Sequence, residues 1–345
     1  MKFIHCSDIH LESPLTSLPD PRKAEERRNE ILLTFVRMVR YAVKNRVQAV
    51  FIVGNLFDTE EASSSTLEIV ERCIAENPAV DFMYVPGNPE KDVFLESLSE
   101  VPENLKLFQD GTRSFRYPGE ERDVVVSVPE SPEDLALSED DINIVLRHDV
   151  IRAADWRDRF IDYLALGQYQ EMEEGSLGAR GRYCHAGCLE GRGFDDCGEK
   201  GFIRLDIENG LIDPVFVKAA KRMSHEVEVD ITGAEGTSDV NRLISEALSG
   251  REIPEEDLVQ VVLTGQMPPE GDLNLRSLSR KYEERFYAFR IVDRELLPDI
   301  DFGSVEYDVS LKGEFIRLVM GAELPEEEKL EIIRIGVEAL KGRRA

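Results

Sequence analysis

Three short apolar segments, separated by two helical patterns, constrain the fold of the N-terminal half most strongly. The apolar segments span residues 3–7, 49–53 and 82–85, and apolar side chains recur at helical spacing within 24–44 and 64–77. Strands that alternate with helices favour parallel order with right-handed crossovers. Polar residues follow each strand, so we expect their side chains to gather at the carboxyl edge of one sheet.

The first strand is followed by Asp8-Ile9-His10. Alternation along an extended backbone would point Asp8 and His10 the same way, and both side chains bind divalent metals. The motif is short, so an aspartate that starts a turn beside a surface histidine is an equally open interpretation. Asn55 and Asp58 follow the second strand and Asn88 follows the third, which places all five side chains at one predicted edge.

A second group of strands is expected downstream, and it indicates a second sheet packed on the first. These strands lie at 124–128, 142–146, 163–166, 201–207 and 212–217. His148 follows the strand at 142–146, and Gln168 and Gln170 follow the strand at 163–166.

Composition excludes several classes of protein. The formal net charge of −27 over 345 residues argues against a chain that binds nucleic acid without a partner, because phosphate binding needs basic surfaces. No apolar run approaches the roughly 20 residues of a membrane span, and the N-terminus resembles no signal peptide. The five cysteines are odd in number, which favours a reducing cytoplasm. Three of the cysteines and a histidine cluster within 184–197, but their spacing matches no common zinc site. Unpaired thiols are therefore the favoured interpretation.

The order of these motifs resembles the calcineurin-like metallophosphoesterases, and most of all the SbcD family of DNA double-strand-break repair nucleases. The strand–helix–strand pattern over 226–265 resembles the capping domain of that family. The resemblance implies an α/β fold of two packed mixed β-sheets flanked by helices, a four-layer αββα arrangement, with a small α+β capping domain. The expected domains are 1–222 (nuclease-like), 223–300 (capping) and 301–345 (C-terminal extension).

The resemblance also implies a two-metal site that activates water and clamps a phosphodiester. Asp8 and His10 match ligands of the first metal, while Asn88 and His148 match ligands of the second. Asp149 stands where a glycine normally follows that histidine.

Four other positions depart from the family pattern. Asn55 stands in place of the aspartate that bridges both metals, and Pro89 in place of the catalytic histidine. Gln168 and Gln170 replace both histidines of the Gly-His-x-His motif. Asn55 removes the charge that keeps two cations together, the glutamines are poor ligands for transition metals, and Pro89 has no ionisable group.

We therefore expect a degenerate site, that of a weak or inactive nuclease subunit. It would hold at most one manganese or other divalent ion, weakly, with auxiliary carboxylates from Asp58, Glu90 or Asp149. Two alternatives stay open: a fully active DNA exonuclease, and a single-metal phosphoesterase that acts on a smaller phosphorylated substrate.

A C-terminal helix is predicted after Pro325, because Leu330, Ile333, Val337 and Leu340 recur at helical spacing. The helix either packs on its own domain or docks the coiled coil of an SbcC-type ATPase, the partner that the resemblance implies. DNA contact is expected only within that complex, and the family also forms homodimers. The basic segment 218–222 is either a solvated linker or a phosphate contact.

Overall fold

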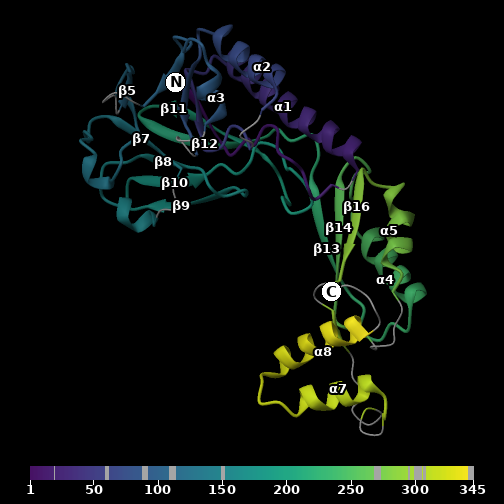
Figure 1. Cartoon of the computed structure of the whole chain (residues 1–345). Helices are drawn as coiled ribbons and strands as arrows, with labels where there is room; N and C mark the ends of the chain where they lie inside the picture. Colours follow the sequence, from purple (N-terminus) through teal and green to yellow (C-terminus); the bar gives the residue numbers. More distant parts are fainter. Residues whose placement is uncertain are drawn as a thin grey trace. The chain divides into compact units, whose positions relative to one another are not determined.

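The structure is a computed structural model in which residues 1–18, 20–58, 62–87, 92–108, 114–148, 152–267, 273–293, 296–298, 305 and 308–340 are described. The chain divides into two compact units, Met1–Met223 and Ser224–Ala345. Figure 1 shows the chain and labels many of its helices and strands. Among the described residues, no helix is both long enough and apolar enough to cross a membrane.

The first sheet of the N-terminal unit has the strand order β12-β11-β1-β2-β3-β4. Its parallel strands are β1 (Lys2–Ser7), β2 (Ala49–Val53), β3 (Asp81–Val85) and β4 (Leu105–Leu107). The antiparallel hairpin β11 (Gly201–Glu208) and β12 (Leu211–Lys218) extends the sheet beside β1. The expectation that these two strands belong to the second sheet was therefore wrong, because β11 pairs with β1. The predicted parallel order of the first three strands is therefore confirmed.

The second sheet has the order β5-β6-β7-β8-β10-β9. Four central strands are parallel: β6 (Val124–Ser127), β7 (Ile142–Arg147), β8 (Tyr163–Leu166) and β10 (Gly181–His185). The edge strands β5 (Ser114–Tyr117) and β9 (Glu173–Leu177) are antiparallel to their neighbours.

Alternate side chains of the two sheets form the main core between them. Phe3, Phe51 and Met83 of the first sheet belong to one buried cluster with Val126 and Ile144 of the second. The two-residue period follows from the pleat, which points successive side chains to opposite faces. This interdigitated apolar layer fixes how the carboxyl ends of the two sheets lie relative to each other.

Helices cover the outer face of the first sheet (Figure 1), namely α1 (Pro21–Lys44) and α2 (Ser64–Ala75), followed along the chain by the short α3 (Val93–Ser97). Asp20 caps α1 by accepting a hydrogen bond from the backbone of Arg22, and Pro21 occupies the first helical position. The outer face of the second sheet packs against the segment of the 3-10 helices η2 (Pro132–Asp134) and η3 (Ala153–Trp156). The expected fold of two packed mixed sheets flanked by helices is confirmed.

The second unit contains a parallel sheet of order β13-β14-β16. Its strands are β13 (Ser224–Asp230), β14 (Leu258–Thr264) and β16 (Ala288–Val292), and its helices α4 (Thr237–Ser249) and α5 (Leu275–Glu283) contribute to their core. Two short strands pair nearby, β15 (Gln266–Met267) and β17 (Leu297–Pro298). The helices α7 (Leu311–Met320) and α8 (Glu326–Leu340) then pack together through Ile316, Ile333 and Val337.

The end of the first unit is fastened to α1 by buried charges. Arg222 is only 8% exposed, and its guanidinium lies 2.9 Å from a carboxylate oxygen of Glu30. Lys221 lies 2.5 Å from the same carboxylate, and Arg27 pairs with both Glu30 and Glu190. Both interpretations of the segment 218–222 were wrong for Arg222. Its guanidinium is buried and pairs with carboxylates of the protein, so it faces neither solvent nor a phosphate.

Candidate active site

The first strand ends at Ser7, and the two residues of the Asp-x-His motif lie in the loop that follows. Asp8 has φ of 44° and His10 has φ of 53°, so both occupy the left-handed region that non-glycine residues rarely adopt. The expectation that extended alternation orients them was therefore wrong. A strained loop directs both side chains to the sheet edge, and such strain persists where surrounding structure enforces it.

Asp8 is the centre of the hydrogen-bond network at this edge. Its side chain is 1% exposed, and Oδ1 lies 3.0 Å from Nε2 of His148. Oδ2 accepts a hydrogen bond of 2.7 Å from the backbone N–H of Gln168, and the backbone N–H of Asn55 approaches Oδ1 at 3.4 Å. Protein donors therefore surround the carboxylate of Asp8.

Two glycines make this close packing feasible, and the sequence analysis did not single them out. A Cβ atom at Gly87 would lie 2.1 Å from Oδ1 of Asn55, and one at Gly54 would lie 2.6 Å from Oδ1 of Asp8 and 2.4 Å from Cδ2 of His148. Gly54 also has φ of 115°. Any side chain at these positions would collide with the site. The available signal was a glycine within two residues of the end of each of two apolar strands, Gly54 directly after Val53 and Gly87 after Val85-Pro86.

His10 lies between two carboxylates. Its Nδ1 is 3.1 Å from Oδ1 of Asp58, outside good hydrogen-bonding alignment, whereas its Nε2 is 4.0 Å from Oδ1 of Asp8. Burial opposes ionisation of Asp58, but contacts with His10, Ser13 and Arg192 outweigh it and lower the pKa of that carboxyl. Asp58 therefore lies against His10 on the side away from Asp8, in the place of an outer-shell carboxylate.

The two glutamines differ in what they bring to the site. Gln168 contacts Asp8 through its backbone N–H. Gln170 places Nε2 3.5 Å from Nε2 of His10, and its buried Oε1 has no hydrogen-bond partner among the described residues. His185, which the sequence analysis had placed only in a cysteine-rich cluster, has Nδ1 2.7 Å from the carbonyl oxygen of Gly167 and so braces the turn that carries Gln168.

The structure brings together seven of the predicted site residues and leaves four untested. The seven that meet at the carboxyl edges of the two sheets are Asp8, His10, Asn55, Asp58, His148, Gln168 and Gln170. Asn88, Pro89, Glu90 and Asp149 lie outside the described residues. All five cysteines are free, as expected.

The described donor set does not fit a two-metal centre. It offers the carboxylate of Asp8, the imidazoles of His10 and His148, and neutral amides. The hydrogen bond between Asp8 and His148 occupies atoms that would otherwise face a cation. Within the described part of the chain, no group of three or more histidine, cysteine, aspartate or glutamate side chains is arranged to hold an ion.

Comparison with known proteins agrees with this architecture. Residues 1–171 match the sequence model of the family described as calcineurin-like phosphoesterase. The N-terminal unit is therefore a calcineurin-like metallophosphoesterase domain. Phosphoester hydrolysis is the reaction of this family, and it depends on divalent metals.

One relative and two solved structures similar to this metallophosphoesterase can be named. The uncharacterized metallophosphoesterase YhaO of Bacillus subtilis (strain 168) is 24% identical, over 83% of this chain and 79% of that protein. A dimetal phosphatase from Danio rerio is 9% identical with a TM-score of 0.41, over 64% of this chain and 99% of that chain. GAP50, an anchor in the inner membrane complex of Plasmodium, is 12% identical with a TM-score of 0.42, over 64% of this chain and 85% of that chain.

Proposed function

We propose that this chain is an SbcD-type DNA repair protein whose nuclease centre is impaired, and that it works in the cytoplasm as a subunit of an SbcC-type ATPase complex. The observation that carries the proposal is the position of Asn55. Its amide lies against Gly87 and beside the Asp8–His148 pair, where the resemblance implies a bridging carboxylate.

Electrostatics explains why this substitution matters. Two divalent ions ~4 Å apart repel by roughly 15 kcal/mol even at an effective dielectric constant of ~20, and a shared anion offsets that repulsion. Asn55 offers an oxygen without charge, and Asp8 already accepts hydrogen bonds from Gln168 and His148. One ion, held weakly near Asp8 and Nε2 of His10, is the most that this donor set supports.

Such an ion would act as a Lewis acid on a phosphoester oxygen when bound. The residues that would hold it are Asp8, in its left-handed loop, and His10, which has the carboxylate of Asp58 beside its Nδ1. Proton transfer to the leaving oxygen would lack the family's histidine, because residue 89 is proline.

A nuclease assay tests this proposal. Purified full-length chain is incubated with manganese and linear duplex or single-stranded DNA, alone and with an SbcC-type ATPase. We expect little or no cleavage above background. Robust cleavage that His10→Ala abolishes would overturn the proposal, and hydrolysis of only small phosphoesters would favour the single-metal alternative.

The α7–α8 hairpin supports the partner part of the proposal. Ile333 and Val337 pack inward against α7, so the expected helix does pack within its own unit. The hairpin nevertheless leaves large apolar side chains outside, with Leu318 71% and Ile335 42% exposed. An apolar helical face fits the apolar seam of a coiled coil.

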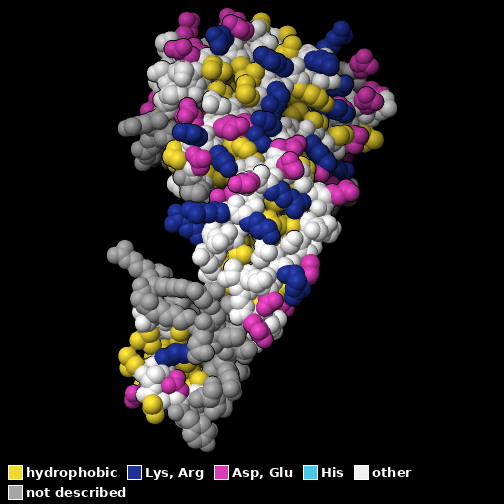
Figure 2. Space-filling model, turned by 90° about the vertical axis from the view of Figure 1, so that its right-hand side faces the viewer, with side chains coloured by type: hydrophobic (Ala, Val, Ile, Leu, Met, Phe, Trp, Pro, Cys, Tyr) yellow, Lys and Arg dark blue, Asp and Glu magenta, His cyan; other side chains and the backbone are white. Residues whose placement is uncertain are grey.

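The distribution of surface charge favours a chain that contacts DNA only as part of a complex. On the face shown in Figure 2, acidic and basic side chains are interspersed over the N-terminal unit, with no continuous basic surface among the described residues there. The chain as a whole carries a formal net charge of −27. A partner that supplies basic surface would therefore provide most of the affinity for phosphates.

The hairpin is tested as a docking site by measuring how tightly the chain binds the coiled-coil segment of an SbcC-type ATPase from the same organism. We expect the double variant Leu318→Glu, Ile335→Glu to bind at least ten-fold more weakly than the full-length wild-type chain. The control Leu33→Glu changes an exposed leucine of α1 and should bind normally. Equal binding by the double variant would reject the hairpin as the dock.

A further inference from the structure

The loop between β10 and β11, residues 186–200, is buried although it carries several charged side chains. Glu190 is fully buried, Lys200 is 2% exposed and Asp196 is 8% exposed. Burial of a charged group is costly unless the group is paired or hydrogen-bonded. The partners of this loop therefore show which parts of the first unit it holds together.

One group of contacts joins the loop to the candidate site at Gln170. Nζ of Lys200 donates to the backbone carbonyl of Gln170 at 2.8 Å, and the backbone N–H of Cys188 donates to the same oxygen at 3.2 Å. The carbonyl oxygen of Gly187 accepts a hydrogen bond of 3.0 Å from the hydroxyl of Ser7 at the end of β1. The loop therefore holds both the backbone of Gln170 and the end of the first strand.

A second contact joins the loop to the candidate site at Asp58. The carboxylate of Asp196 accepts hydrogen bonds from the backbone N–H of Arg192 at 2.9 Å and from its Nε at 3.1 Å, which fixes the guanidinium. Nη1 of that guanidinium lies 3.6 Å from Oδ2 of Asp58. The other oxygen of Asp58 lies 3.1 Å from Nδ1 of His10, so the loop reaches the Asp58–His10 pair.

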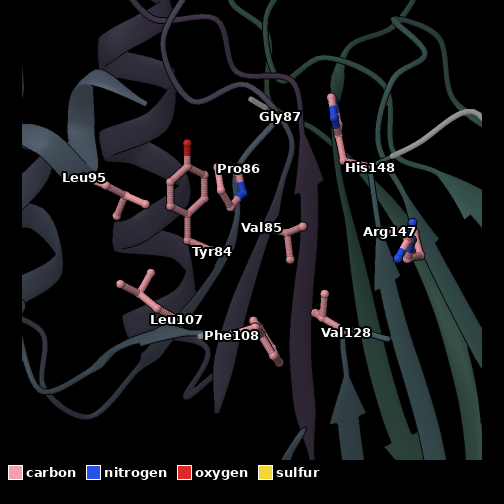
Figure 3. A pocket seen from close by; sticks show the side chains of 10 residues that line it. All are labelled: Tyr84, Val85, Pro86, Gly87, Leu95, Leu107, Phe108, Val128, Arg147 and His148. Atoms are coloured by element: carbon pink, nitrogen blue, oxygen red, sulfur yellow. The ribbon is translucent and has the colours of Figure 1, made fainter. Parts of the chain in front are cut away.

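These contacts are separate from the surroundings of His148. Figure 3 shows that part of the candidate site, around a cavity of 370 Å³. Among the described residues that line the cavity, none belongs to 186–200. The loop therefore approaches the candidate site through Gln170 and Asp58.

Glu190 anchors the loop to the rest of the first unit. Its carboxylate accepts hydrogen bonds from the guanidinium of Arg27 at 2.9 Å and from the hydroxyl of Thr34 at 2.8 Å, and both of these residues belong to α1. The backbone N–H of Lys221 donates to the same carboxylate at 2.7 Å. One buried side chain thus fastens the loop to α1 and to the last residues of the unit.

We propose that Glu190 is a positioning residue of the candidate site, which acts through the loop 186–200 on Gln170 and on the Asp58–His10 pair. It stands two residues from Cys188 and two residues from Arg192, which make the contacts on either side. Glycines make the loop backbone permissive, so without an anchor it would sample many conformations. The glycines within the loop are Gly187, Gly191, Gly193 and Gly198.

Hydrogen exchange of the full-length chain, followed by mass spectrometry, tests this role without a metal or a substrate. We expect Glu190→Gln to speed exchange about ten-fold or more in peptides that cover 166–172 and 186–200, because local opening exposes their N–H groups. These peptides contain the N–H groups of Gln168 and Cys188, which are hydrogen-bonded at the site. The peptide of β14 in the second unit should exchange as it does in the wild type.

Asp162→Asn is the matched control in the same unit. Like Glu190, Asp162 accepts a backbone N–H, that of Asn143 at 2.8 Å, and pairs with an arginine, Arg180 at 2.9 Å. These partners lie outside residues 186–200, so we expect exchange over 166–172 to stay within about two-fold of the wild type.

Two further variants separate positioning from a general loss of stability. Thr34→Val removes one hydrogen bond to Glu190 and keeps its charge, so it should speed exchange several-fold in the same peptides. It also replaces Glu190→Gln if that variant does not fold. Lys200→Met removes the direct contact with Gln170, and its effect on 166–172 should not multiply with that of Thr34→Val, because both act through one loop.

Equal acceleration of exchange over 166–172 in Glu190→Gln and in Asp162→Asn would overturn the inference, because any buried carboxylate would then have the same effect. Unchanged exchange over 166–172 in both Glu190→Gln and Thr34→Val would also overturn it, as would effects of Thr34→Val and Lys200→Met that multiply fully in the double variant. The outcome is separate from that of the nuclease assay, because the exchange measurement needs neither cleavage nor DNA.

Discussion

His148 at the end of β7 lies 3.0 Å from Asp8 at the end of β1, so one hydrogen bond joins the two sheets at their carboxyl edges. The same two residues match ligands of different metals in the resembled family. Here they contact each other directly, and the backbone N–H of Gln168 donates a hydrogen bond to the other oxygen of the Asp8 carboxylate. The protein thus satisfies its central anion with its own donors.

Restoring a charge at position 55 should strengthen metal binding. In Asn55→Asp a second carboxylate would face the site, and we expect manganese affinity to rise at least ten-fold, which corresponds to about 1.4 kcal/mol. Calorimetric titration with manganese measures the change. Asn209→Asp makes the same charge change in an exposed turn and should leave affinity unaltered; equal gains in both variants would point to a nonspecific charge effect.

Gly87→Ala should destabilise the protein because its Cβ would lie 2.1 Å from Oδ1 of Asn55. Overpacking of this kind costs about 1–3 kcal/mol of unfolding free energy. Urea denaturation measures it. Gly236→Ala is the matched control, since a Cβ there meets no atom within 4 Å. A loss of stability at Gly87 no larger than at Gly236 would show that the site relaxes freely around the added methyl group.

Acid should weaken the contact between the end of the first unit and α1. Burial opposes ionisation of Glu30, but hydrogen bonds from Arg222, Lys221 and Arg27 prevail and lower its pKa to about 2. A carboxyl with a depressed folded pKa binds its proton more readily when unfolded. Its stabilising contribution is therefore complete above pH ~4.5 and is lost as the pH falls towards 2.

The variant Glu30→Gln tests that dependence through unfolding free energies measured between pH 7 and pH 2.5. It should be less stable than wild type at pH 7, and the difference should shrink below pH ~4.5. Glu133→Gln alters an exposed ion pair and should change little. A stability difference for Glu30→Gln that is constant with pH would contradict the assigned pKa.

Tyr163→Phe should lower the free energy of unfolding by removing a hydrogen bond between the two sheets. His5 is fully buried, its Nδ1 lies 3.0 Å from the hydroxyl of Tyr163, and burial lowers the pKa of His5 to about 3. Removal of the hydroxyl leaves a buried ring nitrogen without this partner, which costs about 1–3 kcal/mol. Thermal and urea denaturation measure the loss, and the exposed Tyr169→Phe should be neutral.

Much of the N-terminal fold could be predicted because its signals are local. The run Ala49–Val53 is apolar throughout, as a strand buried on both faces must be, and the structure places β2 at the same residues. The spacing of Ile31, Phe35 and Met38 likewise identified the buried face of α1.

Contacts between segments distant in the chain could not be predicted. The pairing of Arg222 with Glu30 joins residues 192 positions apart, and no local pattern indicates it. The orientation of Asp8 and His10 depends on left-handed backbone in a loop, which a strand pattern does not encode. The role of Asp58 behind His10 appears only when both side chains are placed.

Anomalous scattering from crystals soaked in manganese tests the loss of the two-metal centre most directly. The account predicts at most one partly occupied ion, near Asp8 and His10, at millimolar manganese. Two fully occupied ions on either side of Asn55 would contradict it.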